Sequence, residues 1–75
     1  MNAYVIEYHR VSGEYRVEEF AGDGAGERAI GRRLELERRH APGDGWEIVS
    51  LNAESLDVLK RTHSRYFFGR ELVKA

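Results

Sequence analysis

Hydrophobic and polar positions alternate along two early stretches of the chain. Residues 3–11 and 14–20 carry apolar or aromatic side chains at every second position, which predicts two half-buried β-strands. Ser12-Gly13 lies between them, and a glycine in a two-residue loop is typical of a β-hairpin. One face of this hairpin is rich in tyrosine and is the expected core side, with Tyr4, Ile6, Tyr8, Tyr15 and Val17. The charged face is then left to solvent or to a partner.

The spacing of apolar residues changes to that of a helix over residues 25–40. Asp23 or Gly24 could cap this helix, and Pro42 with its neighbouring glycines ends it. Its expected apolar side holds Ala25, Ala29, Ile30, Leu34 and Leu36. A charged stripe of Arg28, Arg32, Glu35 and Arg39 is expected on the opposite side.

Residues 46–52 contain the only tryptophan and have apolar side chains on both faces, which indicates an interior strand. Trp46 and Ile48 are expected to anchor the core, so that replacing Trp46 with alanine would cost roughly 3–5 kcal/mol. A second helix should follow over about residues 53–65, with Asn52 as its N-cap and His63 on its apolar face.

The last stretch, residues 66–74, allows two structures. Its aromatic and β-branched residues favour a final strand with a kink at Gly69. Alternatively, the second helix could run to Phe68 and end at Gly69. With the strand, the chain is a single α+β domain over residues 1–75. Its predicted order is ββαβαβ, a mixed four-stranded sheet with two helices on one face.

Composition narrows the class of protein. The 75 residues contain no cysteine and have a formal net charge of −1, so neither disulfides nor a cysteine-based zinc site is available. No apolar run approaches the roughly 20 residues of a membrane span, and the N-terminus lacks the layout of a signal peptide. These features predict a cytoplasmic domain that does not enter a membrane.

Glu7, His9 and Glu18 would lie near one another on the charged hairpin face, with Glu7 directly opposite Glu18. Carboxylates beside a histidine can bind a metal or transfer protons, which would suit a small enzyme. A solvated face on which His9 and Arg16 offset two acids is favoured over that interpretation. Such a face could also meet a basic partner.

Other routes to catalysis are weaker still. The histidines lack the spacing of a helical metal pair, and no serine or threonine has a nucleophile-elbow context. His40 is expected only to complement the dipole of the first helix. The Gly22, Gly24 and Gly26 run lacks a dinucleotide fingerprint and a P-loop lysine. The sequence therefore predicts no enzyme, no cofactor and no bound metal.

Arginine clusters are the strongest functional signal. Arg28, Arg32 and Arg39 should project together from the first helix, and the last third of the chain adds Lys60, Arg61, Arg65 and Arg70. If the two groups meet in space, they form a cationic patch near Tyr66 and Phe67, suited to single-stranded nucleic acid or an acidic protein. If they do not, they are an ordinary solvated surface.

Two resemblances bear on function. Residues 45–51 resemble the Gly-Trp-Glu-Leu-Val-Ser-Val signature of a small bacterial domain family of unknown function, although the N-terminal hairpin and the extra helix depart from its pattern. The run from residues 52–55 through Lys60-Arg61 to Phe67-Phe68-Gly69 is similar to small phage proteins that include anti-CRISPR inhibitors. Neither resemblance implies a catalytic residue.

The hypothesis that follows is a non-enzymatic protein-binding module. It would be a small regulator or inhibitor, of the phage anti-defence type, that occludes a partner through charged surfaces; a sheet edge could also pair two copies. The alternative is a nucleic-acid-binding protein that uses the arginine patches. The expected contact residues are Glu7, His9, Arg16, Glu18, Arg28, Arg32, Arg39, Lys60, Arg61, Arg65 and Arg70.

Overall fold

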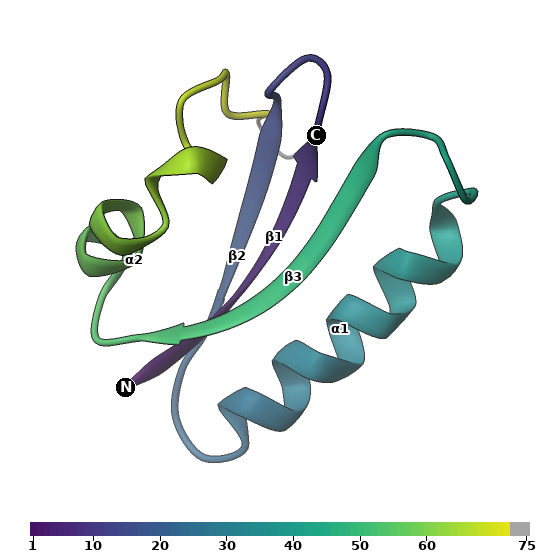
Figure 1. Cartoon of the computed structure of the whole chain (residues 1–75). Helices are drawn as coiled ribbons and strands as arrows, with labels where there is room; N and C mark the ends of the chain where they lie inside the picture. The colour runs from purple at the N-terminus through teal and green to yellow at the C-terminus, as the bar shows by residue number, and fades with distance from the viewer. Residues whose placement is uncertain (73–75) are drawn as a thin grey trace.

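β1 (Asn2–His9) is the central strand of a three-stranded antiparallel sheet in the order β2-β1-β3 (Figure 1). The computed structural model describes residues 1–72. β2 spans Tyr15–Phe20, α1 spans Ala25–Arg39, β3 spans Trp46–Ala53 and α2 spans Leu56–Thr62, followed by a short 3₁₀ turn at Ser64–Tyr66. The side chains of residues 3–7 of β1 are buried, because other elements cover both faces of this strand.

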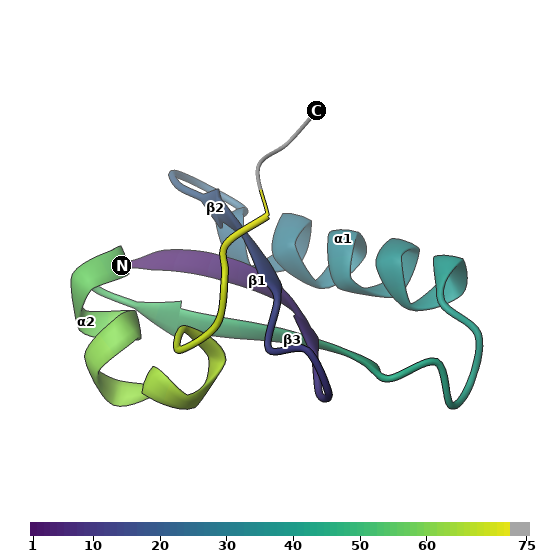
Figure 2. The ribbon, with the colours of Figure 1, turned by 90° about the horizontal axis from the view of Figure 1, so that it is seen from above.

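The two helices cover opposite faces of this sheet (Figure 2). Because side chains alternate along a strand, Ala3 and Val5 of β1 pack against α1. Tyr4 and Ile6 pack on the other face, against Leu59 of α2. The protein is thus a three-layer α+β domain with one hydrophobic cluster on each side of a single sheet.

This architecture corrects the predicted ββαβαβ fold. Within residues 1–72 the sheet has three strands rather than four, its strands pair antiparallel, and the helices do not share a face. The charged side of the hairpin is not left to solvent, because Val5 on that side requires a cover and α1 provides it. The alternation of apolar residues identified the two faces of the hairpin but did not show that both are covered.

β3 is an edge strand and not the interior strand that its pattern indicated. Its Ile48 contributes to the α1 face and its Val49 and Leu51 to the α2 face. A strand with a helix on each side has apolar residues on both faces whether or not both of its edges are paired. The pattern therefore reports the layers and does not report the position in the sheet.

Residues 66–72 do not form the predicted fourth strand, nor do they extend α2 to Phe68. Tyr66 and Phe67 instead pack into the α2-side core. The backbone then touches the edge of β2 at one parallel bridge, between Tyr15 and Glu71. The aromatic residues that suggested a strand thus belong to an irregular segment that packs into the core. Residues 73–74 of the predicted strand lie outside the described residues.

The hairpin register also differs from the prediction. Tyr8 pairs with Tyr15 and Glu7 with Arg16, so Glu7 does not face Glu18. The turn is longer than two residues, and its N–H groups at Val11 and Ser12 donate to the ring Nδ1 of His9, each at 3.2 Å. Relative to the prediction the strands shift by two residues, which keeps every side chain on its expected face.

The predicted N-cap is confirmed for α1 and wrong for α2. Gly24, with φ of 75°, is the N-cap of α1, one of the two residues predicted for that position. α2 is capped by Ser55, whose hydroxyl accepts the N–H of Val58 at 3.3 Å, and not by Asn52, because β3 continues to Ala53. His63 follows α2 as its C-cap residue. Within residues 1–72, neither helix has the length and apolarity needed to cross a membrane.

Candidate protein-binding groove

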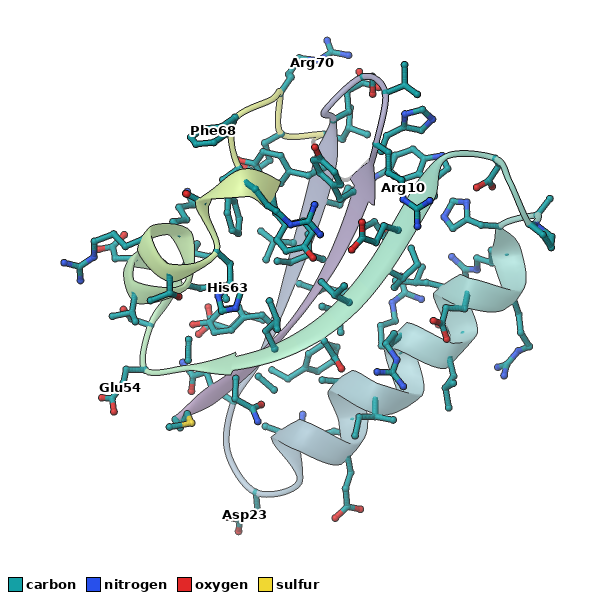
Figure 3. All side chains as sticks on the ribbon, in the orientation of Figure 1. Arg10, Asp23, Glu54, His63, Phe68 and Arg70 are labelled. Carbon is teal, nitrogen blue, oxygen red and sulfur yellow. The ribbon has the colours of Figure 1, made fainter. Side chains whose placement is uncertain are left out.

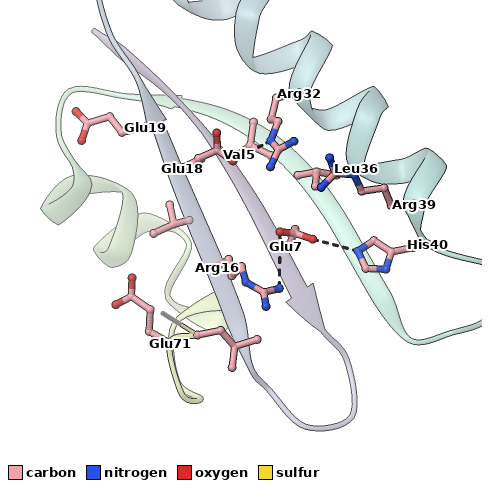
Figure 4. A pocket seen from close by; sticks show the side chains of 12 residues that line it. Val5, Glu7, Arg16, Glu18, Glu19, Arg32, Leu36, Arg39, His40 and Glu71 are labelled. Carbon is pink, nitrogen blue, oxygen red and sulfur yellow. Dashed lines mark hydrogen bonds and ion pairs between the residues drawn. The ribbon is translucent and has the colours of Figure 1, made fainter. Parts of the chain in front are cut away.

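A groove of about 1080 Å³ runs between β2 and the C-terminal half of α1 (Figure 4). Its floor is apolar and includes Val5 of β1 and Leu36 of α1. Its walls carry both acidic and basic side chains. Acidic side chains come from Glu7, Glu18, Glu19 and Glu71, and basic ones from Arg16, Arg32, Arg39 and His40.

Glu7 is the buried centre of this groove, with an exposed fraction of 8%. One carboxylate oxygen lies 4.0 Å from Nη1 of Arg16, its cross-strand neighbour. The other lies 3.0 Å from Nε2 of His40, the residue that ends α1. A buried carboxylate is tolerated only when it is paired and hydrogen-bonded, and here β2 and α1 each supply one partner.

His40 is held on both ring nitrogens. Nδ1 lies 3.3 Å from Oδ2 of Asp44, and the ring stacks on Trp46 with centroids 5.2 Å apart. Asp44 also accepts the N–H of Trp46 at 3.0 Å. That hydrogen bond, followed by the charge of His40, lowers the pKa of Asp44. The loop between α1 and β3 thus fixes the imidazole in place against the groove.

A second set of ion pairs in the groove is centred on Arg32. Nε of Arg32 donates to Glu18 at 2.9 Å, and the same guanidinium also contacts Glu35. These hydrogen bonds raise the pKa of Arg32 and lower that of Glu35. The charged stripe predicted on the outer side of α1 therefore faces β2 in part, because Arg32 reaches across to Glu18.

The structure brings together five of the residues predicted to contact a partner: Glu7, Arg16, Glu18, Arg32 and Arg39. His40, Glu19 and Glu71 also line the groove and were not predicted from the sequence. His40 and Glu7 are 33 residues apart in the chain, and no local spacing signals their contact. The only sequence signal was the position of His40 directly after a helix and four residues before Asp44.

The remaining predicted residues lie elsewhere. Arg28 donates to the carbonyl groups of Ala21 and Asp23 in the loop before α1. Arg65 bonds Glu47 at 3.0 Å, and Lys60 lies over the ring of Phe67, 5.8 Å from its centre. Arg61, on α2, is exposed.

Arg70 pairs with Glu14 beside the hairpin turn, far from α1 (Figure 3). Because α1 and α2 cover opposite faces of the sheet, the two arginine groups do not merge into one cationic patch.

His9 does not join Glu7 and Glu18 in a reactive constellation. Its Nδ1 accepts two backbone N–H groups of the hairpin turn, and its ring meets Trp46 edge to face at 5.0 Å. His63 likewise lies beside the hydroxyl of Thr62, at 3.0 Å from Nδ1. Within residues 1–72 no group of three or more histidine and acidic side chains is placed to hold a metal ion.

Comparisons with known proteins add no relative. No family model matches the chain, and neither a curated protein nor a solved structure matches it. The resemblances of residues 45–51 and of the C-terminal third remain predictions.

Proposed function

We propose that the protein is a non-enzymatic protein-binding module, a small regulator or inhibitor, that takes a charged segment of another protein into the groove between β2 and α1. The observation that carries this proposal is the presence of both acidic and basic side chains in the lining of one groove. An extended polypeptide with residues of both charges complements such a surface.

The pairing of the groove residues favours binding over catalysis. Glu7 uses both carboxylate oxygens, and His40 uses both ring nitrogens, in contacts within the chain. A general base must come within hydrogen-bond reach of its substrate, and the Glu7 carboxylate is buried. Such a network instead holds its members in one arrangement, which suits recognition.

The alternative, nucleic-acid binding, has less support. The guanidinium groups of the groove lie beside Glu7, Glu18 and Glu71, whose charges would oppose a phosphate backbone. On the α2 face, Arg65 is paired with Glu47, although the ring of Phe68 is 82% exposed and could stack on a base.

The test is capture of a partner from host lysate on the immobilised protein. One host protein should be enriched, and Arg16→Glu or Arg39→Glu should reduce its capture at least tenfold, because each reverses a charge of the groove. Arg61→Glu is the matched control, since Arg61 is exposed on α2, on the other face of the sheet, and it should leave capture unchanged.

Equal loss with Arg61→Glu, or no enriched protein, contradicts the groove as the binding site. A fluorescent oligonucleotide provides the second arm of the test. Binding at low salt that falls steeply as salt rises would support the nucleic-acid alternative instead.

A further inference from the structure

The outer edge of β3 has a regular row of unpaired backbone groups. The N–H of Arg10 donates to the carbonyl of Gly45 at 2.8 Å, which sets the phase of the β1–β3 ladder. Hydrogen-bonded pairs alternate with non-bonded pairs in an antiparallel ladder. The backbone groups of Ile48, Ser50 and Asn52 therefore point away from β1. Within residues 1–72, no segment pairs with them.

The opposite edge of the sheet, at β2, is partly paired and carries charged side chains. At β2, the N–H of Tyr15 donates to Arg70 at 3.1 Å, and its carbonyl accepts the N–H of Leu72 at 2.7 Å. β2 also carries charged residues along its length, a common protection against edge pairing. β3 runs for eight residues without proline or lysine. Of the N–H groups of β3 that point away from β1, that of Trp46 donates to Asp44.

α1 exposes an apolar strip of two residues, Ile30 and Leu34, on its side away from β2. Ile30 and Leu34 are 47% and 45% exposed, although a helix packed on a sheet normally buries such residues. Arg32 reaches Glu18 on β2, whereas Arg33 reaches the hydroxyl of Ser50 on β3 at 3.4 Å. The side of α1 that carries Arg33 is thus the side toward β3. Ile30 and Leu34, three residues before Arg33 and one after it, continue around the helix from that side and away from β2.

We propose that a second copy of this chain occupies the edge, with β3 pairing antiparallel to β3 of the second copy and the two α1 helices packing side by side. The same edge strand can pair with itself around a twofold axis, which makes the interface self-complementary. If Ser50 lies on that axis, Ile48 faces Asn52 of the second copy. Each facing pair then exchanges two hydrogen bonds. The two sheets become one.

The position of α1 fits the same axis. A helical side chain covers the turn before its own Cα, so the contact of Arg33 with Ser50 places Ser50 level with the turn around Ile30. Ile30 of both copies would then meet near the axis. Leu34 would lie over Gly26 of the second copy. No atom lies within 4 Å of the position that a Cβ on Gly26 would take, so there is space for the leucine side chain.

Helix spacing supports the second copy as the occupant. α1 packs mainly over β1 and β3, and strands lie about 4.8 Å apart. A twofold axis just outside β3 would bring the two α1 axes to about 10 Å, within the usual packing distance of helices. An unrelated strand could satisfy the edge of β3. The second copy satisfies the edge and the apolar strip of α1 with one operation.

Sedimentation and cross-linking test this arrangement on the full chain. The wild-type protein should sediment at about twice its 8.6 kDa chain mass at high micromolar concentration. The double variant Ile30→Glu with Leu34→Glu should sediment as a monomer, because it places charge on the strip that packs between copies. Phe68→Glu is the control, since Phe68 is 82% exposed on the α2 side of the sheet, and it should remain dimeric. A denaturation curve for each variant separates loss of the dimer from loss of the fold.

Single-cysteine variants fix the register, because the chain contains no cysteine of its own. Ser50→Cys places a thiol at the axis, where facing Cα atoms are about 5.5 Å apart and a disulfide can form. Asn52→Cys, on the same strand, would be about 14 Å from its symmetry mate. Mild oxidation should link the first variant into a covalent dimer and leave the second unlinked.

Three results would overturn the proposal. A wild-type monomer at high micromolar concentration excludes the second copy. A dimer that survives the double glutamate variant uses another surface. Equal linking of Ser50→Cys and Asn52→Cys reflects random collision or another register. None of these results affects the groove, which lies on the β2 side of the sheet, so this proposal and the proposed protein binding can fail separately.

Discussion

Oε2 of Glu7 lies 3.0 Å from Nε2 of His40, which joins the central strand to the residue that ends α1. Leu36 is the last buried residue of α1, so apolar packing ends one turn before this contact. Asp44 continues the chain of contacts to the start of β3. The last turn of α1 is therefore attached to the sheet by polar groups.

Glu7→Ala should lower the free energy of unfolding by about 1–3 kcal/mol, because it removes the partner that Arg16 and His40 share. Glu7→Gln should cost less, since an amide can still bond His40. Chemical denaturation of both variants measures the difference, with Glu54→Ala as the control at an exposed site. If Glu7→Ala equals Glu54→Ala in stability, the pairing does not hold α1 to the sheet.

Acid should destabilise the protein through a small set of carboxylates. The N–H of Trp46 and the charge of His40 lower the pKa of Asp44 below its ordinary value of 3.8, and Arg70 and Arg32 lower the pKa values of Glu14 and Glu35 below 4.5. A carboxyl with a lowered pKa in the folded state adds stability above its unfolded pKa. That stability is lost as the pH falls through the folded value.

The denaturant concentration at the midpoint of unfolding should consequently stay constant from neutral pH to about pH 5. It should decrease once the pH drops below the ordinary pKa values of carboxyl groups. Asp44→Asn should reduce stability near neutral pH and make the acid decline shallower, since the titrating group is gone. Denaturation curves measured at intervals from pH 7 to pH 3 check this. An unchanged acid decline in Asp44→Asn would exclude Asp44 from it.

Trp46→Ala should destabilise the protein less than Leu59→Ala, which reverses the role expected for the tryptophan. Leu59 is fully buried against Tyr4 and Ile6, and its removal should cost about 2–5 kcal/mol. Trp46 is only half-buried at one end of an edge strand, where it packs on the rings of His9 and His40. Urea denaturation followed by circular dichroism compares the two, and a larger loss for Trp46→Ala would contradict the structure.

Local features of the chain were predicted well from the sequence. Periodicity placed the hairpin, α1 and the strand at Trp46, because each depends on neighbours within a few residues. It also separated the side chains of β1 into their two faces. The errors concern how distant elements combine. The pattern at Ile48 and Val49 is the same for an interior strand and for an edge strand between two helices. The pattern at Tyr66 and Phe67 is likewise the same for a strand and for a turn that packs into the core.

The groove was predicted only in part for the same reason. Glu7, Arg16 and Glu18 were chosen for their positions on the hairpin, and Arg32 and Arg39 for theirs on α1. Nothing in the sequence showed that the hairpin face and α1 face each other. Once α1 covers that face, charges assigned to two separate surfaces become the walls of one groove, and His40 joins them.

A pair of glycines offers the last prediction. Gly69 approaches the hairpin turn so closely that a Cβ there would overlap the carbonyl of Gly13, a backbone atom that cannot move aside alone. Gly31 lies within α1, and nothing stands within 4 Å of the position its Cβ would take. Gly69→Ala should therefore destabilise the protein by about 1–3 kcal/mol, whereas Gly31→Ala should stabilise it by about 1 kcal/mol. Thermal and chemical denaturation test both.

In Gly69→Ala the amide of Leu72, which donates to Tyr15, should also exchange with solvent faster, because the segment can no longer dock on β2. If Gly69→Ala has wild-type stability and unchanged exchange at Leu72, the close approach of Gly69 to Gly13 is not what holds the C-terminal segment against the sheet.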